Sequence, residues 1–219
     1  MNLAVTQYTT QNQTLPLSGR HILAQYDAES VIVYQAYNPS IGHFAARNGY
    51  FGGEFSYSRM SWCKPNFLWM MYRSGWGTKE GQEITLAVCL KRPFFESLLA
   101  QAVSSSYDAR LYAKKSEWSL AVSASNVRLQ WDPDHDPSGG SLQRRALQLG
   151  LRGSTLQEYG QSAILSIEDI SAFVAEQRTH LVSPYFEDLL VPVERVYTPK
   201  ETTTAARLQL SDFSDAEII

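Results

Sequence analysis

The stretch VIVYQAYNPSIGHFAARNG, residues 31–49, carries the strongest fold signal in the chain. Its first seven residues are mostly β-branched or aromatic, a composition typical of a strand. Asn38 then precedes Pro39, an order found at helix starts, and Gly49 is placed to end the helix. We therefore predict a strand followed directly by a helix where the folded part begins.

A second helix is predicted between Pro65 and Gly75, around NFLWMMYRS. This helix is apolar on all sides, so we expect it to be buried rather than amphipathic. Residues 55–62 are expected to be extended. Further strands are predicted at residues 84–90, 127–131, 146–151 and 163–167, and further helices at residues 94–103, 116–124, 156–160 and 171–181.

Two of these helices carry an expected cap. Ser116 is the predicted cap of the helix 116–124, and Ser154 with Gln157 forms a predicted capping box for the helix 156–160. Strands and short helices mix without the regular alternation of a doubly wound sheet. We therefore predict an α+β fold with mixed, largely antiparallel sheets and short helices.

The length and composition fit one folded domain. The chain has 219 residues, of which 44% are hydrophobic and 19% are charged. Residues 1–20 and 199–219 are polar, and we expect them to be disordered tails around a single globular domain at residues 21–198. No linker, repeat or low-complexity stretch divides that domain.

Charge and cysteine content exclude several protein classes. A net charge of −3 argues against coating nucleic acid through bulk charge, although a local basic pocket remains possible. Cys63 and Cys89 cannot supply a disulfide framework, and the first residues do not resemble a signal peptide. No apolar run approaches the roughly 20 residues needed to cross a bilayer. We expect a cytoplasmic or nuclear protein with no membrane partner.

The segment RMSWCKPNFLWMMYRSGWGTK, residues 59–79, combines large aromatics with cations. Aromatic rings can stack on a base or a nicotinamide ring while neighbouring cations hold phosphates. The alternative is that the aromatics pack the core and the cations reach solvent, with Arg73 placed favourably at a helix C-terminus. The candidate binding residues of this segment are Arg59, Trp62, Lys64, Trp69 and Arg73.

The stretch VRLQWDPDHD, residues 127–136, contains the second candidate group. Strand alternation places Arg128, Gln130 and Asp132 on one face. The carboxylate can stabilise developing positive charge or act as a base, while the amide orients a nucleophile. The alternative is a solvated strand face.

No metal site is expected. The alternating aspartates after Trp131 begin like a calcium loop, but Pro137 and Gln143 stand where that loop requires Gly and Glu. The four histidines lack the spacing of zinc ligands. The chain also contains no GxGxxG, GxxxxGK[ST], HExxH or GxSxG motif.

Several strings resemble DUF4291, a family of domains of unknown function. They are VYQAYNP, RMSWCKPNFLWMMYRSGW, VRLQWDPDHD, LQLGLRG and IEDIS, and the resemblance runs from about Tyr26 to Tyr197. The family pattern has Thr for Ser61, Ile for Cys63 and Glu-Arg for Asp134-His135. These departures argue against Cys63 and His135 as essential groups. The resemblance implies a common fold without indicating a reaction.

The order of the motifs also has a more distant similarity to ADP-ribosyltransferases. That pattern places NAD contacts on a first strand, an aromatic residue and a serine in the next segment, and a Gln/Glu-x-Glu pair on a later strand. Tyr34, Gln35 and Tyr37 match the first part, Ser58 and Ser61 the second, and Gln130-Trp131-Asp132 the third, with Asp where Glu is expected.

This similarity implies an NAD-dependent ADP-ribosyltransferase-like enzyme that acts on a nucleotide or nucleic acid. Asp132 would stabilise the oxocarbenium and Gln130 would orient the acceptor. Tyr34 and Trp62 would hold the nicotinamide end of NAD, with Lys64 and Arg73 on its pyrophosphate.

Two alternatives stay open. One is a non-catalytic module that binds nucleic acid or a nucleotide through residues 59–79, and the other gives this segment only a structural role. The enzymatic hypothesis requires residues 59–79 and the strand 127–132 to face a common cleft.

Overall fold

Three antiparallel strands form the central sheet of the computed structural model, which describes residues 3–182 and 184–211. They are β4 (Ser30–Tyr37), β6 (Ile84–Lys91) and β10 (Ile164–Asp169), in the order β10-β6-β4. Both faces of this sheet are covered, because Val31 and Val33 point into one apolar cluster while Ile32 and Tyr34 point into another. This double burial explains the almost continuous apolar runs at residues 31–37 and 84–90.

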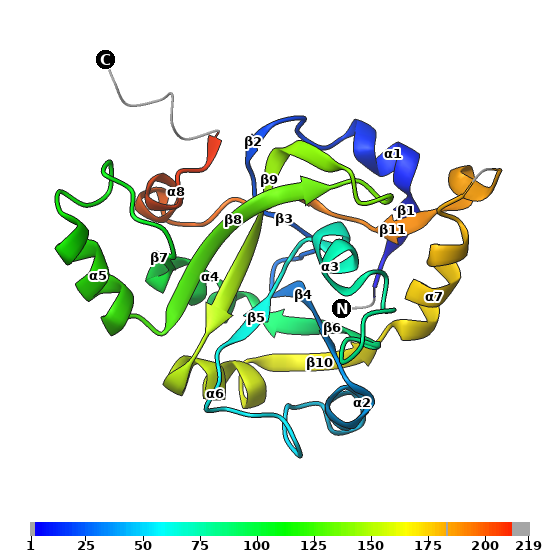
Figure 1. The fold of residues 1–219 in the computed structure, drawn as a ribbon, viewed down its shortest axis with the longest axis horizontal. Helices are drawn as coiled ribbons and strands as arrows, with labels where there is room; N and C mark the ends of the chain where they lie inside the picture. Colours follow the sequence, from blue (N-terminus) through cyan, green and yellow to red (C-terminus); the bar gives the residue numbers. More distant parts are fainter. Residues whose placement is uncertain (1–2, 183, 212–219) are drawn as a thin grey trace.

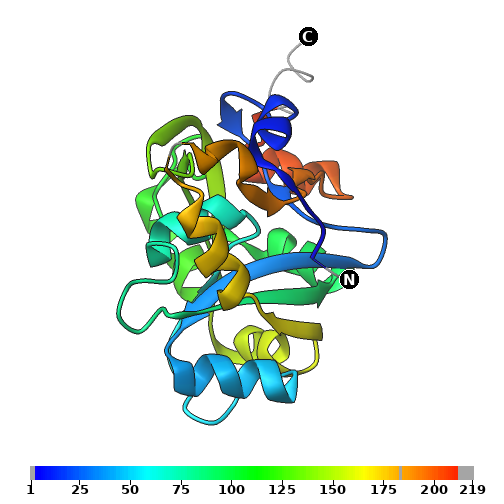
Figure 2. The same cartoon turned by 90° about the vertical axis from the view of Figure 1, so that its right-hand side faces the viewer.

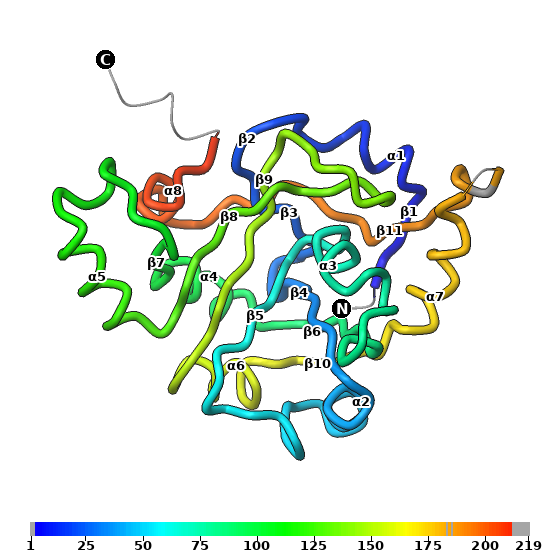
Figure 3. The backbone as a smooth tube through the Cα atoms, viewed as in Figure 1, coloured from blue at the N-terminus to red at the C-terminus, as the bar shows by residue number. Residues whose placement is uncertain are grey.

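The second sheet is built on a long hairpin. Its strands β8 (Val127–His135) and β9 (Ser141–Leu151) pair antiparallel and run side by side (Figure 3). Three short strands extend this sheet, namely β2 (Gly19–Arg20), β5 (Ser61–Cys63) and β7 (Val103–Ser104). The pairs β2–β9 and β7–β8 are parallel, whereas β5 pairs antiparallel with β9. The predicted α+β fold with mixed, largely antiparallel sheets is therefore confirmed.

Helices cover the sheets and join their strands (Figure 1). Their bounds are α2 (Pro39–Asn48), α3 (Phe67–Ser74), α4 (Arg92–Gln101), α5 (Lys115–Ala124), α6 (Gly153–Gln161), α7 (Ser171–Thr179) and α8 (Thr202–Leu208). Helix α2 begins as predicted, with the Asn38 side chain accepting from the backbone N–H of Ile41 at 3.0 Å. Among the described residues, no helix has the length and apolar character needed to span a membrane.

Some local predictions are wrong. The segment 55–62, expected to be extended, is mostly irregular with a turn, and only its end belongs to β5. Ser116 lies inside α5 rather than at its cap, and Ser154 lies inside α6. Helix α6 starts two residues earlier than a capping box on Ser154 would require, because Gly153 adopts the left-handed φ of 57° and turns the chain into the helix.

The described parts of the predicted tails are folded, which corrects the expectation of disorder. Strand β1 (Val5–Gln7) pairs with β11 (Leu190–Pro192), and α1 (Tyr8–Gln13) follows it. Helices α1 and α2 lie at opposite ends of the molecule (Figure 2). Near the C-terminus, α8 buries Ala205 and Leu208 in the core. Residues 1–2 and 212–219 of the predicted tails lie outside the described residues.

A buried carboxyl group supports the start of helix α3. Glu194, which precedes β12 (Arg195–Val196), is 7% exposed. Its Oε1 accepts a hydrogen bond from the backbone N–H of Phe67 at 2.6 Å, and its Oε2 accepts one from Asn66 Nδ2 at 3.2 Å. Burial raises the pKa of Glu194 to about 8, although the hydrogen bond from Phe67 acts in the opposite direction.

Glu194 is expected to make the stability of the domain fall as the pH rises. The folded state keeps the Glu194 proton up to a pKa of about 8, whereas the unfolded chain releases it near 4.5. Between pH 4.5 and about pH 8 the folded state binds more protons than the unfolded state, so the free energy of unfolding declines as the pH rises through this range. We measure the free energy of unfolding in urea at about pH 5 and at about pH 8. Between these two pH values, we expect it to fall by on the order of a few kcal/mol more in wild type than in Glu194→Gln. An equal change in both proteins would contradict this role.

Candidate functional site

A cleft of about 560 Å³ opens where strands β4 and β5, helix α3 and the β8–β9 hairpin meet. Most of its lining residues are polar or charged. They are Gln35, Ala36, Tyr37, Arg59, Met60, Ser61, Trp62, Lys64, Met70, Arg73, Gln82, Gln130 and Gln148. Residues 59–64 and the strand containing Gln130 therefore share one concave surface, as the enzymatic hypothesis requires.

The short strand β5 brings Trp62 and Lys64 to this cleft. Trp62 lies opposite Gly150 of β9, and a Cβ atom at Gly150 would approach Cε2 and Cζ2 of Trp62 to 2.9 Å. The absence of a side chain at Gly150 therefore lets the indole lie against the strand. On its other side the chain joins β4, since the backbone of Lys64 exchanges hydrogen bonds with Tyr34 at 2.6 and 3.2 Å.

The Lys64 amine lies in a sheltered part of the cleft. The residue is 4% exposed, and its Nζ lies 6.0 Å from the centroid of the Trp69 ring. Within the described part of the chain, this Nζ has no hydrogen bond and no ion-pair partner. Burial is the main cause that lowers the pKa of Lys64 to about 8; the nearby Arg73 charge acts in the same direction, while Cys63 and Asp132 act in the opposite one.

Two glutamine amides stand in front of Asp132. Gln130 and Gln148 face each other across β8 and β9, and both line the cleft. Their Nε2 atoms donate to Asp132, from Gln130 to Oδ1 at 2.8 Å and from Gln148 to Oδ2 at 2.6 Å. Asp132 is half-buried and is not one of the lining residues. Its carboxylate therefore orients both amides and places a negative charge directly behind them.

A second polar network fixes the wall formed by β4. Gln35 Nε2 donates to Ser61 Oγ at 2.9 Å and to the Trp62 carbonyl at 3.0 Å. Its Oε1 accepts from the Tyr159 hydroxyl at 2.6 Å, and the hydroxyls of Tyr37 and Ser61 lie 2.7 Å apart. Burial raises the pKa of the Tyr37 hydroxyl, so Tyr37 remains a neutral hydrogen-bonding group.

The rim of the cleft is positively charged. Arg59 and Arg73 are exposed, and Arg73 lies in the last turn of α3. Neither guanidinium has an ion-pair partner among the residues that the structure describes. Among the described residues that line the cleft, none is acidic, whereas the whole chain has a net charge of −3. The cleft thus concentrates positive charge in an acidic protein.

Two predicted contact residues lie elsewhere. Tyr34 is fully buried with its ring against Phe67, because it points to the opposite face of β4 from Gln35. Trp69 is 7% exposed, lies among the buried residues of α3 and packs its ring near Tyr72 and His135. The structure therefore does not bring either ring to the cleft lining, in contrast to Gln35, Tyr37 and Trp62.

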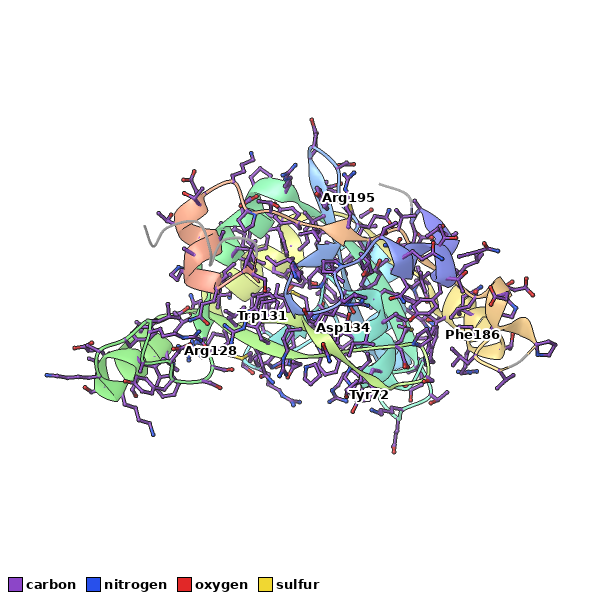
Figure 4. The ribbon with its side chains drawn as sticks, turned by 90° about the horizontal axis from the view of Figure 1, so that it is seen from above. Tyr72, Arg128, Trp131, Asp134, Phe186 and Arg195 are labelled. Atoms are coloured by element: carbon purple, nitrogen blue, oxygen red, sulfur yellow. The ribbon has the colours of Figure 1, made fainter. Side chains whose placement is uncertain are left out.

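The strand β8 carries three further residues with structural roles. Figure 4 shows Arg128, Trp131 and Asp134 along this strand, with Tyr72 beside its far end. Arg128 is 9% exposed and donates to the Ser125 carbonyl at 3.2 Å, so it does not join the predicted row in the cleft. Trp131 points to the other face and donates to the Leu208 carbonyl at 3.3 Å.

Sequence reasoning missed Gln148 and Gln82. Counting back from the hairpin turn pairs Gln130 with Ala146, but a register shift between Pro133 and His135 places Gln148 opposite Gln130. The shift keeps both residues on the same face, so alternation along the predicted strand 146–151 was the available signal. Gln82 lies in a loop after Gly81, and no pattern of the sequence points to it.

The remaining candidate groups show no sign of reactivity. Cys63 is fully buried, and burial raises the pKa of its thiol to about 12. His135 is stacked 3.5 Å from the Tyr72 ring centroid, and burial lowers the pKa of its imidazole. Across the described ranges, no three His, Cys, Asp or Glu side chains form a group that could hold a metal ion.

Comparison with known proteins gives a family without an activity. A family model described as a domain of unknown function (DUF4291) matches residues 21–197. No curated protein matches the chain. The expected likeness to ADP-ribosyltransferases is not supported by these comparisons.

Proposed function

Since this chain belongs to the DUF4291 family, whose model covers most of the folded domain, we propose an activity from the cleft itself: binding of NAD and transfer of its ADP-ribose to a nucleotide or nucleic acid. The observation that carries the proposal is the concentration of positive charge in a cleft without acidic lining residues among those described. Such a surface favours a ligand with several phosphate charges.

The size and lining of the cleft support a nucleotide ligand. Its volume of about 560 Å³ lies within the range of small-molecule sites. Arg59 and Arg73 are placed to hold the pyrophosphate by charge-assisted hydrogen bonds, and the charged form of Lys64 adds a third cation. Trp62 offers an aromatic surface for the nicotinamide ring, and the glutamine amides offer partners for ribose hydroxyls.

The arrangement behind the amides supports glycosyl transfer. When the bond between the ribose carbon and nicotinamide breaks, both electrons stay on the nicotinamide nitrogen and positive charge develops on the ribose. The Asp132 carboxylate, held by Gln130 and Gln148, would stabilise that charge. The carbonyl oxygen of Gln130 would orient the acceptor, whose attack forms the new bond at the same ribose carbon while the acceptor's proton passes to solvent.

A non-catalytic nucleotide-binding or nucleic-acid-binding module is the second candidate. The observation in its favour is that both Asp132 oxygens already accept hydrogen bonds from glutamine amides. A carboxylate used in this way can simply hold the cleft walls in place. This candidate keeps the phosphate contacts of Arg59 and Arg73 without any turnover.

Two measurements on the same protein test the proposal. We expect NAD to raise the Tm, since a ligand at 100 times its Kd adds about 2.7 kcal/mol to the free energy of unfolding. Arg73→Gln should weaken the binding of NAD by about tenfold or more, since a hydrogen bond to a charged group contributes about 1.5–3 kcal/mol. Lys200→Gln, which changes an exposed lysine outside the cleft, is the matched control.

Nicotinamide release then separates the two candidates. Incubation with NAD and a pool of nucleotide, DNA and RNA acceptors should release nicotinamide if the protein is a transferase. NAD binding without release would support the non-catalytic module, whose affinity for nucleic acid should fall steeply as salt increases. If neither millimolar NAD nor short oligonucleotides shift the Tm, and no nicotinamide is released, both candidates are contradicted.

A further inference from the structure

We propose that Lys64 is also a nucleophile whose neutral amine forms an imine with a phosphate-bearing aldehyde bound in the cleft. This activity is separate from ADP-ribosyl transfer and does not depend on it. The proposal rests on the position of the amine, on its lack of partners and on the two arginines at the rim.

The Lys64 side chain lies in a place where a lysine would normally have a partner. It is 4% exposed and lines the cleft, yet its Nζ has no hydrogen bond or ion pair within the described part of the chain. Charged groups are rarely buried unless they are paired. The Trp69 ring, whose centroid is 6.0 Å from Nζ, gives only a weak cation–π contact and does not replace a hydrogen-bond or ion-pair partner.

The buried position of Lys64 makes its neutral amine easier to form than that of a surface lysine. Burial disfavours a proton on Nζ most strongly, and Arg73 of α3 acts in the same direction, while Cys63 of β5 and Asp132 of β8 oppose them. The result is a lysine with a pKa of about 8. Lysines that are desolvated beside another cation are the ones that attack carbonyl groups.

The backbone of Lys64 is anchored where the end of β5 meets β4. The backbone of Lys64 is hydrogen-bonded to Tyr34 of β4, and the preceding residue Cys63 pairs with Leu149 of β9. The base of the side chain is therefore fixed between the two sheets. An anchored backbone and a buried side chain lower the entropy cost of orienting the amine, compared with a flexible surface lysine.

The reaction consists of addition followed by loss of water. The lone pair on Nζ forms a bond to the aldehyde carbon, the π electrons of the carbonyl move to its oxygen, and a proton moves from nitrogen to oxygen to give a carbinolamine. Protonation of the hydroxyl then allows water to leave as the carbon–nitrogen double bond forms. Neither an oxidant nor a reductant takes part.

Arg59 and Arg73 define the substrate class. Both are exposed cations at the rim, without ion-pair partners among the described residues, and they can hold a phosphate while the aldehyde reaches Lys64. Gln35, Gln130 and Gln148 can bind hydroxyl groups between the two ends. We therefore assign a phosphorylated sugar in its open aldehyde form as the class of ligand.

The test uses pyridoxal 5′-phosphate as the probe, because it combines an aldehyde with a phosphate. The wild-type protein is incubated with a small excess of probe, reduced with borohydride and digested, and the labelled peptides are identified by mass spectrometry. We expect one main label, on Lys64, with a rate that is half-maximal near pH 8. Pyridoxal lacks the phosphate, so its rate of labelling at Lys64 should be lower by a factor of about ten or more, as expected when a charge-assisted contact is lost.

Two controls keep the result interpretable. Lys91→Gln removes an exposed lysine outside the cleft and should leave the number of labels per chain unchanged. The peptide map locates the label in the wild-type protein, so the test does not depend on the folding of a Lys64 variant. Labels spread over exposed lysines with none on Lys64 would overturn the proposal, as would equal rates for the two probes. Labelling of Lys64 in a protein that releases no nicotinamide would support this inference and contradict the proposed transferase.

Discussion

Replacing Asp132 by Asn is expected to slow nicotinamide release from NAD by about 100- to 1,000-fold. The Asn side chain is nearly the same size but lacks the charge that would stabilise the ribose as nicotinamide leaves. It also loses one of the two oxygens that accept hydrogen bonds from Gln130 and Gln148, at 2.8 and 2.6 Å. The rate of release under saturating NAD, followed by chromatography, gives the measurement.

The affinity for NAD separates a catalytic effect from a structural one. Since Asp132 does not line the cleft, we expect the Kd for NAD to change only a few-fold in Asp132→Asn. Glu168→Gln, at an exposed position of β10, is the matched control and should keep the wild-type rate. Equal rates in wild type and Asp132→Asn would remove Asp132 from the proposed reaction.

Arg144→Leu is expected to lower the free energy of unfolding by about 3–5 kcal/mol. Arg144 Nε donates to Asp134 Oδ2 at 2.5 Å, and the two side chains are only 3% and 0% exposed. Removing the arginine leaves the Asp134 carboxylate buried without its countercharge. Arg144 Nη1 also donates to the Pro16 carbonyl at 3.3 Å, so the variant should loosen the N-terminal segment from β9.

Chemical unfolding of a small set of variants measures this effect. Arg145→Leu changes the exposed neighbour on the same strand and should shift stability by less than about 0.5 kcal/mol. Adding Asp134→Asn to Arg144→Leu removes the stranded charge and should restore part of the lost stability. Equal stabilities of Arg144→Leu and Arg145→Leu would show that the buried pair is not needed.

The strands and helices were the most predictable part of the fold because their signals are local. Asn38 and Gly49 bound α2 as their capping chemistry predicts, and Gly75 ends α3 with a left-handed φ of 59°. The apolar runs that became β4 and β6 could be identified because both faces of their sheet are buried. The order of the strands within each sheet depends on pairing between segments far apart in the chain, which short sequence patterns do not reveal.

The N-terminal segment misled sequence reasoning because its polar residues are satisfied by distant partners. Gln11 is 6% exposed, and its amide donates to the Glu194 carbonyl and accepts from the Glu194 N–H. A glutamine with such partners can be buried, whereas the same residue in isolation suggests solvent. No property of residues 1–20 on their own points to β11.

The candidate site was predictable where strand alternation decides which way a side chain points. Alternation correctly placed Gln130 toward the cleft, but the same rule applied to β4 would have separated Tyr34 from Gln35 and Tyr37. The unpaired burial of Lys64 could not be predicted, since it results from two sheets meeting at β5.

A structure of the protein crystallised with saturating NAD tests most directly whether a nucleotide occupies the cleft. We predict pyrophosphate oxygens within about 3 Å of the Arg59 and Arg73 guanidinium nitrogens and an aromatic ring of NAD against Trp62. NAD bound away from this cleft, or a cleft that stays empty at saturating NAD, would contradict the account.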